Sequence, residues 1–198
     1  MPTNLTHITQ YFTELDALKL IERRTYIDGG RRLENSAEHS WHLAMACWSL
    51  SRSLNLQLNE EKLLKLALVH DLGEIDAGDT FLYSKDRSTA NTAERACVKR
   101  LAQHTGNGIR DLPDLWEEQE TGQSPETKLL KTVDRLLPFL HNLASQGKTW
   151  LELGIKESQV LKAHAFIKID FPEIHEWMLN EIDQAVQLGW LNMHGTDK

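Results

Sequence analysis

The segment from Asn59 to Asp71 constrains the fold of this 198-residue chain more than any other stretch of its sequence. Asn59 is a favoured residue at the start of a helix, and the positions from Leu63 to Val69 are almost all apolar. A helix with so little polar surface belongs in the interior of a domain. It ends at the adjacent pair His70-Asp71, and an ionised carboxylate is costly to bury unless a positive group meets it. A divalent metal ion is a natural partner for such a pair.

Helical periodicity dominates the rest of the sequence, and no run of alternating β-branched residues predicts a strand. Asn35 followed by Glu38 is a capping-box pattern that starts a second helix, and Ser124 followed by Pro125 starts a long one. We expect helices over about 5–21, 36–50, 60–70, 89–104, 111–116, 125–140, 158–169 and 172–188, with an irregular segment at 29–30. The predicted fold class is all-α, a bundle of about eight helices in a single domain over residues 1–198.

Composition limits the classes of function. The net charge of −7 argues against nucleic-acid polymers as partners, because binding them requires a basic surface. A small phosphate ester is compatible with it, since one metal ion and one or two arginines can reverse the charge locally. The two cysteines provide neither a disulfide framework nor a CxxC zinc site. The first residues lack the pattern of a signal peptide, and no apolar run reaches the roughly 18 residues that span a bilayer. A cytoplasmic location is expected.

Two further potential metal ligands face the predicted core from other helices. His39 is in phase with the apolar Leu43, and Asp134 lies at the edge of the stripe that contains Leu130 and Leu137. An isolated His-Asp pair is more often a hydrogen-bonded core histidine beside a solvated aspartate. Three separate helices that each present a ligand favour a metal site instead. Imidazole and carboxylate groups suit Mn²⁺, Fe²⁺, Co²⁺, Ni²⁺ or Zn²⁺.

The order His39, His70-Asp71, Asp134 resembles the H…HD…D signature of the HD-domain superfamily of metal-dependent phosphohydrolases. The resemblance is closer to one branch, the HD-type 5′-deoxynucleotidases, and covers about residues 15–145. It lies in three segments: ENSAEHSWHLAM (Glu34–Met45), LALVHDLGEIDAGD (Leu66–Asp79) and LWEEQETGQSPETKLLKTVDRL (Leu115–Leu136). It implies an HD-domain helical bundle in which His39, His70, Asp71 and Asp134 bind one divalent cation. Mn²⁺, Co²⁺, Fe²⁺, Ni²⁺, Zn²⁺ and Mg²⁺ all stay open as its identity.

The same resemblance implies roles for three more residues. Glu74 and Asp79 are expected to be acidic catalytic residues that do not bind the metal. A carboxylate such as Glu74 can take a proton from water, and an acid such as Asp79 can assist the leaving oxygen. Arg23 is expected to hold the substrate phosphate through charge-assisted hydrogen bonds. Without the resemblance, each of them would be taken for a loop or surface residue. Alternative phosphate ligands are Arg24, Arg31 and Arg32.

Some positions depart from the pattern of the deoxynucleotidases. The residues after Arg23 lack the tryptophan found there in that branch, and the segment from Thr80 to Tyr83 lacks its prolines. Preference for deoxyribose, or for a particular base, is therefore open. Only His104 lies between the HD pair and Asp134, whereas dinuclear members need additional histidines there, so a single metal is expected. The run from Glu117 to Glu120 is expected to be a solvated helix face.

The leading hypothesis is hydrolysis of (deoxy)nucleoside 5′-monophosphates to nucleoside and phosphate. A second enzyme hypothesis keeps the metal site but changes the substrate to a nucleoside di- or triphosphate, a cyclic nucleotide or an alarmone. A third hypothesis is a non-catalytic metal- or nucleotide-binding module, although Glu74 and Asp79 beside the ligands argue against it. A homodimer is expected from the apolar, tryptophan-bearing helix over 172–188.

Overall fold

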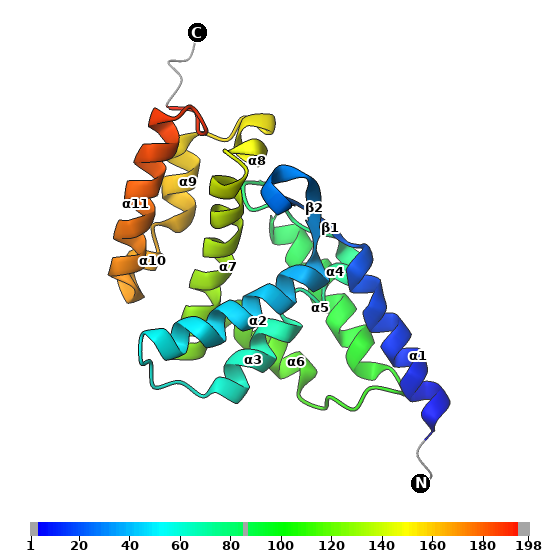
Figure 1. The fold of residues 1–198 in the computed structure, drawn as a ribbon. Coiled ribbons are helices and arrows are strands. Elements are labelled where there is room, and N and C mark those ends of the chain that lie inside the picture. Colours follow the sequence, from blue (N-terminus) through cyan, green and yellow to red (C-terminus); the bar gives the residue numbers. More distant parts are fainter. Residues whose placement is uncertain (1–3, 85–86, 194–198) are drawn as a thin grey trace. The chain divides into compact units, whose positions relative to one another are not determined.

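The structure, a computed structural model, describes residues 4–84 and 87–193, with the backbone alone at 87–89. Its all-helical class agrees with the prediction (Figure 1). The helices outnumber the expected eight, and α4, α8 and α10, each only four or five residues long, are the additional α-helices. The helices are α1 (Leu5–Asp16), η1 (Ala17–Leu20), α2 (Ser36–Ser53), α3 (Glu60–Val69), α4 (Glu74–Ala77), α5 (Arg87–Gln103), α6 (Leu112–Thr121), α7 (Pro125–Ala144), α8 (Lys148–Glu152), α9 (Glu157–His164), α10 (Ile167–Asp170) and α11 (Pro172–Gln187).

A short antiparallel hairpin corrects the expectation that the chain has no strand. Strands β1 (Glu22–Ile27) and β2 (Arg32–Asn35) pair in a two-stranded sheet. The turn η2 between them holds Asp28, Gly29 and Gly30 at φ of 53°, 62° and 92°, a region that glycine enters without steric cost. Strands this short contain too few residues for an alternating pattern to stand out from the sequence.

The described chain forms two compact units. Unit 1 contains residues 4–23, 35–80 and 87–131, and unit 2 contains residues 24–34, 81–84 and 132–193. The expectation of a single domain over 1–198 stays a prediction. None of the helices in the described part of the chain has the length and apolarity that crossing a bilayer requires.

In unit 1, the other helices pack mainly against α3 and α5. Helix α2 packs against α3, α3 against α6, and both α4 and α6 against α5. Leu63, Leu66 and Ala67 of α3 are fully buried, as the apolar pattern predicted, whereas Leu68 is 55% exposed and corrects that expectation at one position. A second group of buried side chains joins α1, α5 and α6: Tyr11, Leu18, Val69, Leu72, Cys97, Val98, Leu101, Leu112 and Trp116.

Helix caps fix where α2 and α3 begin. The Asn35 side chain accepts a hydrogen bond from the backbone N–H of Glu38 at 2.9 Å, and the Glu38 carboxylate accepts one from the Asn35 N–H at 3.3 Å. The predicted capping box is thus confirmed. Asn59 caps α3 by accepting from the Lys62 N–H at 3.0 Å. Each such cap contributes about 1 kcal/mol. These helix starts determine which way His39 points in the first turn of α2. They also determine where the His70-Asp71 pair lies after α3.

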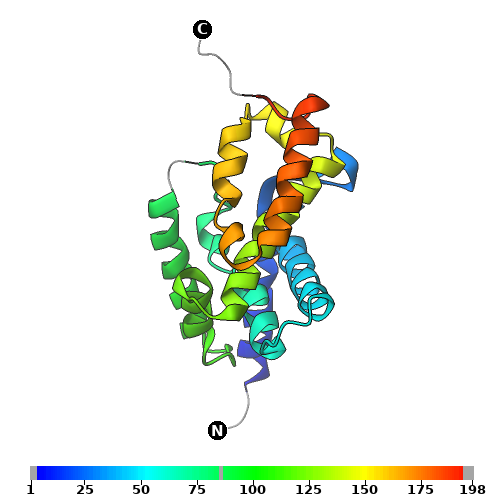
Figure 2. The same ribbon diagram turned by 90° about the vertical axis from the view of Figure 1, so that its left-hand side faces the viewer.

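Unit 2 has its own apolar core. Helices α9 and α10 pack on α11 (Figure 2). The buried side chains of this core are Phe139, Trp150, Ile155, Val160, Ile167, Met178, Ile182, Ala185 and Leu191. Phe81 and Tyr83 also pack against this core, and burial raises the pKa of Tyr83 to about 12.

Candidate metal centre

Three of the four predicted ligands lie together in unit 1. His39 comes from the first turn of α2, and His70 and Asp71 directly follow α3. One ligand atom from each lies within 4.8 Å of the others, and the two imidazole centroids are 5.3 Å apart. His39 is fully buried and His70 is 8% exposed. Two imidazoles and a carboxylate at this spacing fit a borderline divalent ion.

The orientation of His70 suits a metal ligand. Its Nδ1 donates to the carbonyl of Ala67 at 2.7 Å, which leaves the lone pair on Nε2. That buried Nε2 makes no hydrogen bond among the described residues, and it lies 3.0 Å from Oδ1 of Asp71. Trp116 Nε1 and Gln119 Nε2 of α6 donate to the His70 carbonyl at 3.2 and 3.4 Å. These hydrogen bonds therefore fix the position of His70, and its acceptor atom Nε2 faces the Asp71 carboxylate. A shared cation would satisfy both groups.

Arg23 holds the other oxygen of Asp71. Its Nη1 donates to Oδ2 at 2.8 Å and lies 3.8 Å from Oδ1 of Asp79, and all three side chains are only 10–12% exposed. Burial raises the pKa of the Asp71 carboxyl, but its interactions with His70 and with the Arg23 guanidinium together hold that pKa below its ordinary value. Asp71 is thus kept ionised, with one oxygen facing His70. The predicted contact of Arg23 with substrate phosphate stays a prediction.

Glu74 begins α4 and is 7% exposed. The hydroxyl of Ser36, at the start of α2, donates to its Oε2 at 2.6 Å. Burial, together with the negative charges of Asp71 and Asp79, raises the pKa of Glu74 to about 9. In the protein without metal, this carboxyl therefore keeps its proton at neutral pH. A carboxyl whose pKa is strongly shifted, beside a group of candidate metal ligands, suits a residue that transfers protons.

The remaining predicted site residues belong to unit 2. Asp134 lies on α7, where it accepts a hydrogen bond from Arg135 at 2.6 Å, and its role as the fourth ligand stays a prediction. The side chains of the three alternative phosphate ligands, Arg24, Arg31 and Arg32, are exposed.

Sequence reasoning missed three supporting residues. Ser36 lies one helical turn before His39, in the same phase of α2, so helical spacing could have indicated it. Trp116 and Gln119 hold the His70 backbone from α6, and no local pattern points to that contact. Gln119 is 7% exposed, so the expectation of a solvated face over 117–120 is wrong at this position.

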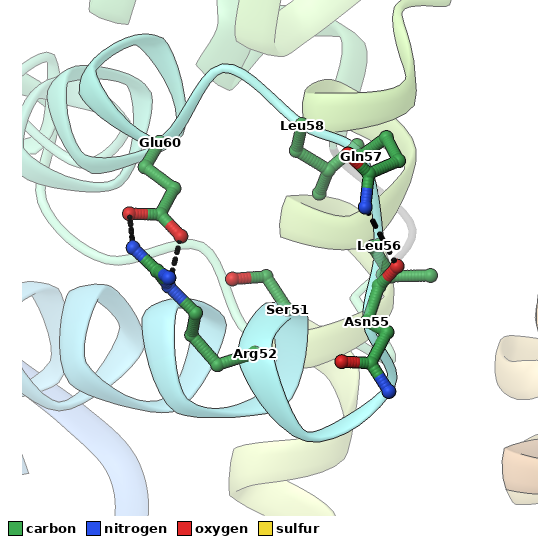
Figure 3. Close-up of a pocket in the computed structure, with 7 residues that line it drawn as sticks. All are labelled: Ser51, Arg52, Asn55, Leu56, Gln57, Leu58 and Glu60. Carbon is green, nitrogen blue, oxygen red and sulfur yellow. Dashed lines mark hydrogen bonds and ion pairs between the residues drawn. The ribbon is translucent and has the colours of Figure 1, made fainter.

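A separate hollow of about 400 Å³ lies where α2 ends and α3 begins (Figure 3). Its two charged lining side chains, Arg52 and Glu60, bind each other, with Nη2 donating to Oε2 at 2.8 Å. Arg52 is 13 residues after His39 on one helix, which corresponds to about 20 Å. The hollow contains none of the predicted site residues, so we assign it no part in the site.

Comparisons with known proteins agree with the sequence signature. The model of the family described as HD domain matches residues 15–175. The solved structure of a predicted metal-dependent phosphohydrolase from Magnetospirillum magnetotacticum MS-1 is 30% identical in sequence, with a TM-score of 0.86 and 96% of each chain covered. An HD-domain phosphohydrolase from Listeria innocua, 20% identical, has a TM-score of 0.60 over 92% of this chain and 96% of its own, which shows likeness of fold alone.

Two curated relatives are similar at lower identity. The 5′-deoxynucleotidase HDDC2 of Danio rerio is 27% identical over 135 residues, which are 67% of this chain and 66% of that protein. The chain thus spans slightly less than two thirds of that relative. The 5′-deoxynucleotidase YfbR of Salmonella paratyphi B is 25% identical over 194 residues, which are 89% of this chain and 96% of that protein.

Proposed function

Because this chain belongs to the HD-domain family and is an HD-domain phosphohydrolase, we propose that its substrates are nucleoside 5′-monophosphates. The products would be a nucleoside and phosphate. The observation that carries the proposal is the grouping of His39, His70 and Asp71 beside the buried Glu74 and Arg23 in unit 1. The names of the relatives from Danio rerio and Salmonella support the choice of substrate class.

We propose that His39, His70 and Asp71 hold one divalent ion, with Asp134 as the fourth ligand. A metal held by these residues would polarise a phosphoryl oxygen and lower the pKa of water. With the positive charge of a bound ion nearby, Glu74, fixed by the Ser36 hydroxyl, would lose its own proton. As a carboxylate it would then take a proton from water and later return it.

Arg23 would have two tasks in this site. It orients Asp71 through the 2.8 Å contact with Oδ2, and it would bring positive charge to the substrate phosphate. A guanidinium carries five N–H donors in a rigid fork, so one side chain can bind a carboxylate and a phosphate together. Asp79, 3.8 Å from the same Nη1, would assist the leaving 5′ oxygen.

A metal-by-nucleotide screen tests the proposal. Purified protein, stripped of metal and resupplied with Mn²⁺, Co²⁺ or Mg²⁺, should release phosphate from ribo- or deoxyribonucleoside 5′-monophosphates. Di- and triphosphates, cyclic nucleotides and alarmones should be turned over more slowly. Faster turnover of one of those classes would show that it, and not the monophosphates, is the substrate class. If metal-loaded protein hydrolyses none of the nucleotides, the enzyme function itself is refuted.

We also propose that two copies of the chain pair through α11, where Trp177 is 40% and Leu179 is 37% exposed. Light scattering during gel filtration should give twice the chain mass of 22.7 kDa. A single-chain mass at micromolar concentration would rule the homodimer out. The cytoplasmic location stays a prediction.

A further inference from the structure

Glu74 lies on a helix that cannot fix its own position. Helix α4 has only four residues, from Glu74 to Ala77, and an isolated helix this short is unstable because nucleation costs more than one turn returns. Its place in unit 1 must therefore come from the elements that it packs on. Helix α5 is the main one among them, and the two lie together in Figure 1.

Close backbone approach makes the first contact between these helices. Gly73, just before α4, lies so near α5 that a Cβ at this position would be 2.6 Å from Cβ of Glu94 and 2.8 Å from its Cα. Any larger residue would push α4 away from α5. Three residues further along α5, Cys97 Sγ donates to the carbonyl of Leu72 at 3.5 Å. Both contacts hold the segment that leads into Glu74.

The third contact is the strongest and comes one more turn along α5. Arg100 binds Asp76 of α4 with two parallel hydrogen bonds, Nε to Oδ2 at 2.8 Å and Nη2 to Oδ1 at 2.9 Å. Its Nη1 also donates to Glu14 of α1 at 2.6 Å. The hydrogen bond from Arg100 lowers the pKa of Asp76. A two-point fork favours one direction as well as one distance, so the pair opposes rotation and sliding of α4.

We propose that Arg100 is a positioning residue for Glu74, acting through Asp76, which lies two residues further along the same short helix. The inference rests on the proposed function, in which Glu74 transfers a proton. The Ser36 hydroxyl meets Glu74 at 2.6 Å, and that contact needs α4 in one place. A displacement of about 1 Å at a reacting group can lower the rate about a hundredfold.

The competing explanation is that Arg100 forms an ordinary surface ion pair. Its side chain is 43% exposed, and exposed pairs contribute little to stability. Unit 1 offers a matched control in Arg52, which binds Glu60 through two contacts between α2 and α3 (Figure 3). Arg52→Met removes the same kind of pair without touching α4.

Two measurements on the metal-loaded full chain separate these explanations. Arg100→Met and the milder Asp76→Asn should raise hydrogen–deuterium exchange in residues 72–79 and lower kcat about tenfold or more, with KM changed less than twofold. Arg52→Met should leave both quantities as in the wild type. Arg100→Lys, which keeps the charge without the fork, should recover only part of kcat.

A double variant tests whether the effect passes through Glu74. In a Glu74→Gln background, Arg100→Met should cause no further loss of kcat, because the group being positioned is already gone.

Each contrary result has a distinct meaning. Unchanged exchange in 72–79 would overturn the inference whatever the enzyme does. Increased exchange with kcat equal to that of Arg52→Met would also overturn it, while leaving the proposed function intact. A wild-type protein that hydrolyses no nucleotide would refute the proposed function and with it the role for Glu74, although the exchange data would still show whether Arg100 holds α4.

Discussion

Two buried histidines, one in each unit, make the same kind of hydrogen bond to the backbone but differ in their surroundings. His70 in unit 1 donates from Nδ1 to a carbonyl three residues earlier at 2.7 Å, and His164 in unit 2 does so to the carbonyl of Val160, four residues earlier, at 2.6 Å. Neither Nε2 has a hydrogen bond among the described residues. His70 faces Asp71 at 3.0 Å, whereas His164 meets the ring of Phe139, with centroids 5.6 Å apart. The backbone bond sets the tautomer, and the neighbours distinguish a candidate metal ligand from a core residue.

Two other buried polar groups, Asn142 in unit 2 and Glu74 in unit 1, show a similar contrast. In unit 2, Asn142 accepts from the Trp150 N–H at 3.3 Å and donates to the Pro138 carbonyl at 3.0 Å, so its amide serves backbone structure. In unit 1, the buried carboxyl of Glu74 is left with a pKa raised to about 9. The Asn142 amide, bonded through both its oxygen and its nitrogen, supports the fold, whereas the Glu74 carboxyl is a buried group whose charge state can change.

The largest expected effect comes from exchanging the two histidines for glutamine. His70→Gln should lower metal affinity by at least about a hundredfold, since even residues that only support ligands contribute about ten- to a hundredfold. His164→Gln should leave metal affinity unchanged. Metal titration followed by calorimetry measures both. Equal losses of metal affinity in the two variants would mean that both substitutions act through folding and that His70 does not bind the metal.

The next effect concerns proton transfer in unit 1. Glu74→Gln keeps the shape of the side chain and removes its ability to take a proton, so kcat should fall about a hundredfold or more while the protein still binds its metal. Steady-state kinetics alongside metal analysis will check this. Full activity in this variant would remove Glu74 from the mechanism.

A smaller effect is expected at Arg23. Arg23→Lys keeps the positive charge but loses the two-sided fork that can serve Asp71 and a phosphate together, so kcat/KM should fall about tenfold to a hundredfold. Arg24→Lys, at an exposed neighbouring position in unit 2, is the control and should change kcat/KM little. If the control is the more damaging variant, the phosphate ligand has been assigned to the wrong arginine.

The smallest effect is a pH dependence in unit 2. Burial lowers the pKa of His164 below its ordinary 6.5, so the unfolded chain gains a proton that the folded chain does not. The wild-type protein should lose stability relative to His164→Leu as pH falls below 6.5 toward the folded pKa. Urea unfolding at pH 7.5 and pH 5 measures the difference between the two proteins. A constant difference at both values would contradict the assignment of His164 as a neutral core residue.

The sequence was informative where a feature depends on neighbours within one helix. The helix starts at Asn35 and Asn59 were predicted from capping patterns, and helical phase turned His39 toward the interior. The sequence did not predict contacts between segments that are far apart along the chain. Arg100 meets a residue of α1 that is 86 positions away, and the hairpin that carries Arg23 depends on pairing across a turn. Such contacts have no local period, so only the folded chain reveals them.

The contact of Arg23 with Asp71 has a consequence for how this protein acquires its ion. The guanidinium already compensates much of the negative charge at the site, so folding need not wait for the metal, unlike in small zinc domains that collapse only around their ion. Metal loading would then follow folding. The ion found in the purified protein would therefore reflect which divalent metal the growth medium supplied, as much as any preference built into the ligands.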